Sequence, residues 1–178
     1  SWRVADVPAT WWTAPPSPDP AWRLYLRGFM WFGPVVDQAL ATGDRALLEA
    51  LRDTAFDFLS ADPDPGTNAA GWDEGTNLRR EQNLNCLWRA LGDRSLLPVL
   101  RATVRANLDP ARYYGPPAHP VHNHGVMANL TLIDTGQLTG LPNCVETGAA
   151  RLARDSELAW TPSGEEIWYS AAPAGAGR

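Results

Sequence analysis

The residues best suited to chemistry lie together in one short segment of the chain. All three histidines, His119, His122 and His124, fall within six positions, and Asn123 stands between the last two. Imidazole titrates near neutral pH and serves as a general acid or base, whereas an amide can donate a hydrogen bond to a carboxylate. A zinc site is one alternative, but the spacing matches no standard zinc pattern. A structural alternative makes these residues loop and cap positions, with Asn123 as the N-cap of a helix.

A second polar segment precedes this one by about fifty positions. It reads GWDEGTNLRREQNL at 71–84 and offers an indole, Trp72, in a loop, followed by Arg79 and Arg80 on a predicted helix. Arginine grips carboxylates and sulfates through two parallel hydrogen bonds. A solvated charged face or an ion pair with Glu81 is the alternative for the arginines.

Two further side chains extend the list of candidates. Tyr114, in the loop before the histidines, could lie against a sugar ring. Asp73 and Glu74 are adjacent carboxylates. They favour the hypothesis of a glycoside hydrolase, an enzyme that uses paired carboxylates.

With its neighbours, the histidine segment resembles a known family. The string HNHGVMANLTLID at 122–134, preceded by the segment at 71–84, is similar to the heparinase II/III-like polysaccharide lyases, which are related to bacterial alginate lyases. The resemblance covers roughly residues 20–165. It implies an incomplete α/α toroid and cleavage of uronic-acid polysaccharides of the heparin, heparan sulfate or alginate kind by β-elimination. It also favours a secreted or periplasmic protein.

The resemblance also implies roles for particular residues. Asn123 would neutralise the uronate carboxylate, and His124 would support it or act as a base. Tyr169 corresponds to the family's catalytic tyrosine, but it follows Gly164 too soon and no histidine comes after it. The residues expected to bind the substrate are Trp72, Arg79, Arg80, His122 and Tyr114. No metal or other cofactor is expected.

The family has a β-sheet domain after the toroid, and no segment of this chain could form it. We therefore expect an incomplete active site, with a missing C-terminal β-sheet domain as its partner. The alternative function is a noncatalytic helical module that binds an acidic glycan or a protein through the same cleft. An unrelated helical-repeat scaffold is a third hypothesis.

The elements that must position these residues are all helical. Apolar spacing predicts a first helix from Ala21 to Leu40 with a kink at Gly33 and Pro34. Further helices are predicted over 45–59, 78–91, 96–108, 126–133 and 145–158. No strand pattern competes with them, so the fold class is all-α.

A repeated turn organises these helices into hairpins. The string ATGDRALLEAL at 41–51 recurs as ALGDRSLLPVL at 90–100, and a weaker echo, LTGLPN, follows at 138–143. A glycine ends one helix and an aspartate starts the next, which is typical of an αα-hairpin. The long loops at 61–75 and 109–122 should then share one edge, where function is expected.

Length and composition limit the number of domains and the kinds of partner. At 178 residues the chain suits one domain, which we divide into a Trp/Pro-rich extended arm (1–20), the toroid-like hairpins (21–160) and a truncated motif with an Ala/Gly tail (161–178). The net charge of −5 argues against nucleic acid as a partner, and no apolar run is long enough for a membrane span. The partner should instead be an acidic polysaccharide. Cys86 and Cys144 are too far apart to suggest a zinc knuckle or a disulfide framework.

Overall fold

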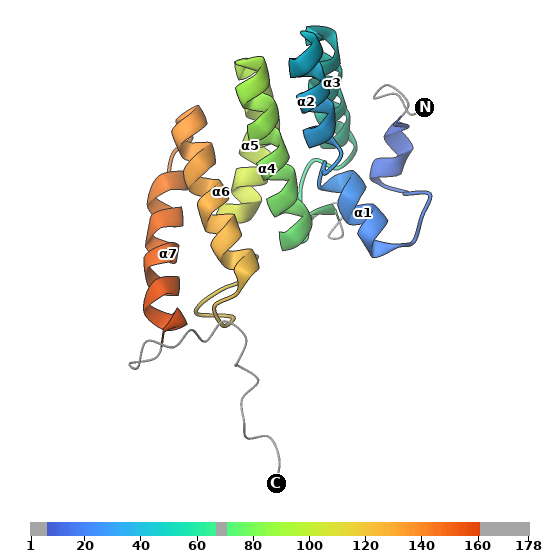
Figure 1. Ribbon diagram of the computed structural model, residues 1–178. Coiled ribbons are helices and arrows are strands. Elements are labelled where there is room, and N and C mark those ends of the chain that lie inside the picture. The colour runs from blue at the N-terminus through green and yellow to red at the C-terminus, as the bar shows by residue number, and fades with distance from the viewer. Residues whose placement is uncertain (1–6, 67–70, 161–178) are drawn as a thin grey trace.

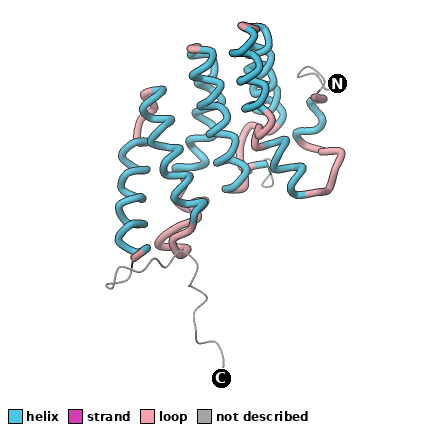
Figure 2. Tube along the Cα trace, in the orientation of Figure 1, coloured by secondary structure: helices cyan, strands magenta, loops and turns pink. Residues whose placement is uncertain are grey.

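The computed structural model describes residues 7–66 and 71–160, and these residues form helices joined by turns and loops (Figures 1 and 2). No strand occurs in this part of the chain, so the all-α prediction is confirmed. The elements, in chain order, are η2 (Ala9–Trp12), α1 (Pro20–Arg27), α2 (Phe32–Thr42), α3 (Arg45–Ala61), α4 (Glu74–Leu91), η4 (Arg94–Leu96), α5 (Leu97–Leu108), α6 (Asn123–Thr139) and α7 (Cys144–Ala159).

The longer helices pair into antiparallel hairpins that stand side by side. The pairs are α2 with α3, α4 with α5, and α6 with α7, and Figure 1 shows them in one row. Helix α4 packs against α2 on one side and α6 on the other, and α5 contacts α3 and α7 in the same way. Each hairpin therefore covers one face of the next.

The repeated turns close the hairpins as the sequence predicts. Gly43, Gly92 and Gly140 all adopt the left-handed conformation, with φ of 69°, 61° and 72°. Glycine reaches this region without the steric cost that a Cβ brings. Asp44 caps α3 by accepting a hydrogen bond from the Leu47 amide at 3.1 Å. The tight turns lie along one edge of the row, at the same end of every hairpin, so the loops before α4 and α6 share the opposite edge (Figure 2).

The break in the first predicted helix lies earlier than expected. Helix α1 ends at Arg27 and α2 begins at Phe32, so Pro34 occupies the first turn of α2, where no backbone N–H is needed. Phe29 holds the break in a left-handed conformation (φ 53°). Its ring is fully buried and stacks on Phe32 at 4.4 Å. Tertiary packing, rather than local propensity, therefore places the corner.

The predicted extended arm contains a short helix that is anchored in the core. Trp12, in η2, is fully buried and meets the edges of Phe29 and Phe58 at 6.0 and 5.6 Å between ring centroids. Its carbonyl accepts a hydrogen bond from Arg27 Nη2 at 2.5 Å. The arm thus covers the α2–α3 end of the row.

Two residues expected to bind substrate belong to this core instead. Trp72 is 1% exposed, and Arg80 is fully buried, with its guanidinium 4.0 Å from the Phe58 ring centroid and 4.6 Å from that of Trp72. Arg80 donates hydrogen bonds to the carbonyls of Arg27 and Gly71. Burial lowers the pKa of Arg80 to about 9, so the side chain remains charged at neutral pH. Neither side chain can reach a polymer on the surface, and the expectation for both was wrong.

The contact between α6 and α7 depends on glycine. A Cβ at Gly148 would lie 2.6 Å from the Asn129 carbonyl oxygen and 2.8 Å from Ile133 Cγ1. We expect Gly148→Ala to lower the free energy of unfolding by about 1–3 kcal/mol, because overpacking forces the two helices apart. Urea denaturation monitored by circular dichroism would measure the change.

Gly33 provides the matched control. It lies in helix α2, and an added Cβ would meet only Asn83 Oδ1, at 3.8 Å. Gly33→Ala should raise the free energy of unfolding by roughly 0.5–1 kcal/mol. If both substitutions changed the free energy of unfolding equally, the close contact at Gly148 would not be what makes this position intolerant of a Cβ.

Candidate active site at the start of helices α4 and α6

The first turns of α4 and α6 lie side by side at the edge of the row that carries the long loops. Glu74 is the first residue of α4, and its Oε1 lies 2.9 Å from Nδ1 of His124 in α6. Both side chains are partly exposed, at 34% and 39%. Asp73 caps α4 by accepting from the Thr76 amide at 3.0 Å. A carboxylate and an imidazole from neighbouring hairpins therefore form a pair that a ligand can reach.

The hydrogen bonds fix which ring nitrogens are free. His124 donates from Nδ1 to Glu74, which leaves Nε2 as the nitrogen able to accept a proton. His122 is the N-cap of α6, and its Nδ1 accepts from the His124 amide at 3.2 Å. Burial, and then the neighbouring His124, lower the pKa of His122. His122 is thus held neutral more readily than an exposed histidine.

Aromatic rings from the preceding loop border this pair. Tyr114 is 38% exposed and stacks on His119, with centroids 4.4 Å apart and planes 21° from parallel. Its edge also meets His122, at 4.8 Å and 80°. Aromatic faces of this kind suit the C–H faces of a sugar ring.

A buried polar cluster anchors the loop that carries Tyr114. The Tyr113 hydroxyl donates to the Asp155 carboxylate at 3.0 Å and accepts from Asn129 Nδ2 at 2.9 Å. Arg151 lies 4.2 Å from the Tyr113 ring centroid. Burial raises the pKa of Tyr113 to about 12, which suits a structural phenol rather than a catalytic one.

Gly125 lets the loop approach the first turn of α6. A Cβ at this position would lie 2.6 Å from the Tyr114 carbonyl oxygen. The glycine of the Asn-His-Gly string therefore has a structural reason. This close approach and the hydrogen bonds of Tyr113 together hold Tyr114 beside the histidines.

Asn123 is the first residue of α6 and not its N-cap, which corrects the structural alternative for this residue. Its side-chain Oδ1 has no accessible surface and no hydrogen-bond partner in the described part of the chain. An unsatisfied buried oxygen costs about 1–3 kcal/mol. Other buried side chains of the described residues, Asn77 and Asn129 among them, also carry such an atom, so this feature does not by itself mark a functional position.

The predicted site residues fall into distinct groups. The rings of His124, His122 and Tyr114 lie together, and Asn123 is their neighbour along the chain, in the first turn of α6. Arg79 is partly buried on α4, where its Nη1 donates to Gln82 Oε1 at 3.1 Å. Trp72 and Arg80 lie in the core, as described above, and Tyr169 lies outside the described residues.

Sequence reasoning missed the link between Glu74 and His124. The sequence predicts Glu74 only as half of a carboxylate pair with Asp73. In the structure, the Asp73 carboxylate instead accepts a hydrogen bond as the cap of α4. A signal was present, because the two residues are fifty positions apart, close to the spacing of the hairpin repeat. Equivalent positions of successive hairpins lie side by side.

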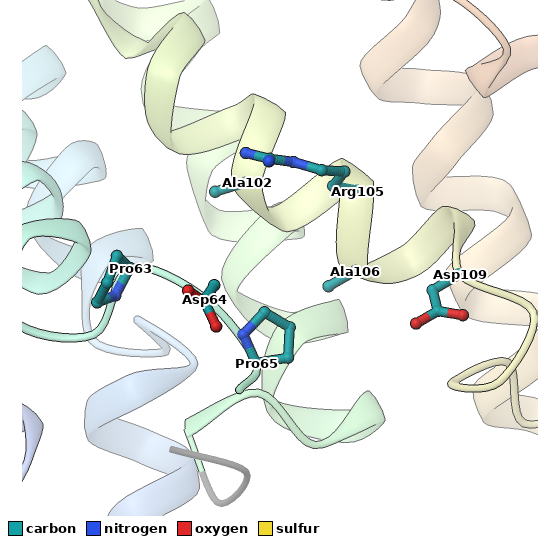
Figure 3. A pocket seen from close by; sticks show the side chains of 7 residues that line it. All are labelled: Pro63, Asp64, Pro65, Ala102, Arg105, Ala106 and Asp109. Atoms are coloured by element: carbon teal, nitrogen blue, oxygen red, sulfur yellow. The ribbon is translucent and has the colours of Figure 1, made fainter. Parts of the chain in front are cut away.

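Within 7–66 and 71–160, no three or more His, Cys, Asp or Glu side chains are arranged to hold a metal ion. A pocket of about 290 Å³ lies between α5 and Pro63–Pro65 of the loop after α3, and it contains none of the predicted site residues (Figure 3). No helix among the described residues has the length and apolar character that crossing a membrane requires.

A scan against protein-family models found no match, and searches of curated proteins and of solved structures found none either.

Proposed function

We propose that the protein is a polysaccharide lyase-like protein that acts on uronic-acid polymers by β-elimination at the loop end of α4 and α6. The observation that carries this proposal is the 2.9 Å contact between Glu74 and His124, the residue that follows Asn123 in the first turn of α6. It gives a partly exposed imidazole a fixed orientation and a free Nε2, as a general base requires.

The reaction needs a base close to a neutralised carboxylate. His124 Nε2 removes the proton at C5 of the uronate, the electron pair forms the C4–C5 double bond, and the bond from C4 to the glycosidic oxygen breaks. The leaving oxygen takes a proton from the site or from water. The Asn123 amide donates to the uronate carboxylate, which lowers the cost of charge developing at C5.

Glu74 is the positioning residue for this step. Its carboxylate holds the Nδ1–H of His124, so the ring presents Nε2 outward, and it stabilises the imidazolium that forms when the proton is taken. The N-termini of α4 and α6 add partial positive charge at the same edge, which favours an anionic substrate.

The row of hairpins supports a finer proposal for the fold, an arc of an α/α toroid. Each hairpin covers one face of the next, and the long loops gather at one end, as a ring of helix pairs requires. In this proposal the remainder of the ring and a β-sheet domain would complete the cleft.

A noncatalytic glycan-binding module is the second candidate. Tyr114 favours it, because this side chain is 38% exposed even though its ring stacks on His119, and an exposed aromatic ring can bind sugars without any reaction.

Tyr114 makes binding testable separately from turnover. We expect Tyr114→Ala to weaken binding of a uronate oligosaccharide roughly three- to tenfold, since it removes the aromatic surface, and Tyr114→Phe to keep the affinity. Isothermal titration calorimetry would measure both. Equal losses for Ala and Phe would indicate that the hydroxyl, rather than the ring face, is needed.

The proposed function itself is tested with paired polymers. At least one of alginate and heparan sulfate should be bound and cleaved, whereas the same polymer with its carboxyl groups reduced to alcohols should not. Binding of the native polymers without unsaturated products would favour the noncatalytic module. Equal binding of native and reduced polymers would contradict a uronate site of either kind.

A further inference from the structure

A second polar contact between α4 and α6 lies deeper in the protein than the candidate site. Glu81 follows Glu74 by seven residues, which is about two helical turns, so both side chains lie on the side of α4 that faces α6. Glu81 is fully buried, and its carboxyl oxygens contact Thr135 Oγ1 of α6 at 2.6 Å and Asn107 Nδ2 of α5. One carboxyl group therefore connects α4 and α5 to the next hairpin.

The groups that surround Glu81 do not offer it a positive charge. On α6 the charged neighbour is Asp134, which is itself acidic, and α5 presents the uncharged amide of Asn107. On α7, burial and then Glu81 raise the pKa of the Cys144 thiol to about 11, so the thiol stays uncharged. Arg151 of α7 donates to backbone carbonyls of α5 instead. In the part of the chain that the structure describes, no cation pairs with Glu81, so its ionisation buries an uncompensated charge.

The hydrogen bonds of Thr135 favour the protonated form of Glu81. The Thr135 hydroxyl has one hydrogen but two close acceptors, Glu81 Oε1 at 2.6 Å and the Thr131 carbonyl at 2.8 Å. Asn85 Nδ2 donates to the same hydroxyl at 2.9 Å. A protonated Glu81 donates its own hydrogen to Thr135, which then keeps its bond to Thr131. Loss of the proton leaves one of these two contacts without a hydrogen.

The α6–α7 hairpin depends more on such polar contacts than the first two hairpins do. The main core of buried apolar side chains extends from Trp12 to Ala106 and, among the described residues, includes none from α6 or α7. The last hairpin is joined to α5 by a small apolar cluster of Val104, Leu132 and Cys144. Parts of a protein with few buried apolar contacts open at a lower free energy than the whole fold.

We propose that Glu81 is a pH-sensitive contact: when it loses its proton, the α6–α7 hairpin opens from α4–α5, and Glu74 and His124 separate. Burial raises the pKa of Glu81 to about 7, so the protonated side chain contributes fully below pH 4.5, and its contribution is lost as the pH rises through about 7. The effect on turnover rests on the proposed function, whereas the opening itself does not.

Hydrogen–deuterium exchange of the full chain measures this opening directly. A hairpin that leaves its neighbours loses the packing that keeps short helices formed, so its amides exchange. After correction for intrinsic exchange rates, the most protected amides of α6 and α7 should be at least about tenfold less protected than those of α3. Their protection should also fall roughly ten- to fiftyfold between pH 5.5 and pH 8.5.

Two substitutions of the same kind test the role of Glu81. Glu81→Gln cannot ionise, so the protection of α6 and α7 should change little between the two pH values. Glu146→Gln replaces an exposed glutamate of α7 and should keep the wild-type response. For polymers that the chain cleaves, Glu81→Gln should also extend turnover to higher pH than in the wild type.

Three results of the exchange experiment would overturn the proposal. In the wild type, these are equal protection of α6–α7 and α3, which indicates that the hairpin opens only with the whole fold, and protection that does not change with pH. The third is a Glu81→Gln variant that retains the wild-type pH response. Absence of polymer cleavage would contradict the proposed function and would leave these three results unchanged.

Discussion

His124→Ala should lower the rate of β-elimination by about 10²–10⁴-fold, because it removes the proposed general base. The side chain is partly exposed and its polar contact is with Glu74, so the fold should survive. The rate of formation of unsaturated product, measured at saturating uronate polymer, reports the loss.

Two controls separate catalysis from packing. His119→Ala removes a histidine of the loop before α6, which lacks the contact to Glu74, and it should lower the rate much less. Glu74→Gln keeps a hydrogen-bond acceptor for His124 Nδ1 but removes the charge, so its rate should fall between those of the wild type and His124→Ala. Equal rates for His124→Ala and His119→Ala would contradict the assignment of the base.

Glu81→Gln should stabilise the fold by about 3 kcal/mol more at pH 8 than at pH 4.5. Glu81 is fully buried, and its carboxylate accepts hydrogen bonds from Asn107 and from Thr135 Oγ1. Burial raises its pKa from 4.5 to about 7, although these two hydrogen bonds oppose the shift, and Asp134 adds to it.

The stabilisation by Glu81→Gln is larger at high pH because the pKa of Glu81 is raised in the folded state. Because folding raises the pKa of Glu81, its protonated form contributes fully to the free energy of unfolding below pH 4.5. That contribution is lost as the pH rises through about 7. Glutamine resembles the protonated form and does not titrate, so the variant escapes the loss. Urea denaturation at the two pH values gives the difference.

Glu49→Gln serves as the control for this effect. Glu49 is on the exposed side of α3, where it pairs with Arg45, and such pairs contribute little to stability. Its effect should be nearly the same at both pH values. If Glu81→Gln were equally insensitive to pH, the buried carboxyl would not carry the proposed proton linkage.

The hairpins could be predicted from the sequence because their signals are local. A glycine that must be left-handed and an aspartate that caps the next helix are adjacent in the chain, as at Gly43 and Asp44. No distant contact is needed to recognise such a turn.

Burial could not be predicted with the same success. Arg79 and Arg80 are neighbours of one type, and only the packing of α4 on Phe58 and Trp72 decides that Arg80 points inward. The corner at Phe29 also depends on rings from other parts of the chain. Both errors arose where tertiary contacts override local preference.

The candidate site could be predicted only in part. The histidine segment was recognised because its residue types are adjacent, but the partner of His124 lies on another hairpin. Pairing Glu74 with His124 requires knowing that the first turns of α4 and α6 lie side by side.

The most direct test of the central claim is the ultraviolet absorbance of unsaturated uronate after incubation of the chain with alginate, heparan sulfate, hyaluronan and chondroitin. The proposed function predicts that absorbance rises with at least one of these polymers, and that Asn123→Ala abolishes most of the rise. No increase with any of them would contradict lyase activity at the Glu74–His124 site of this chain.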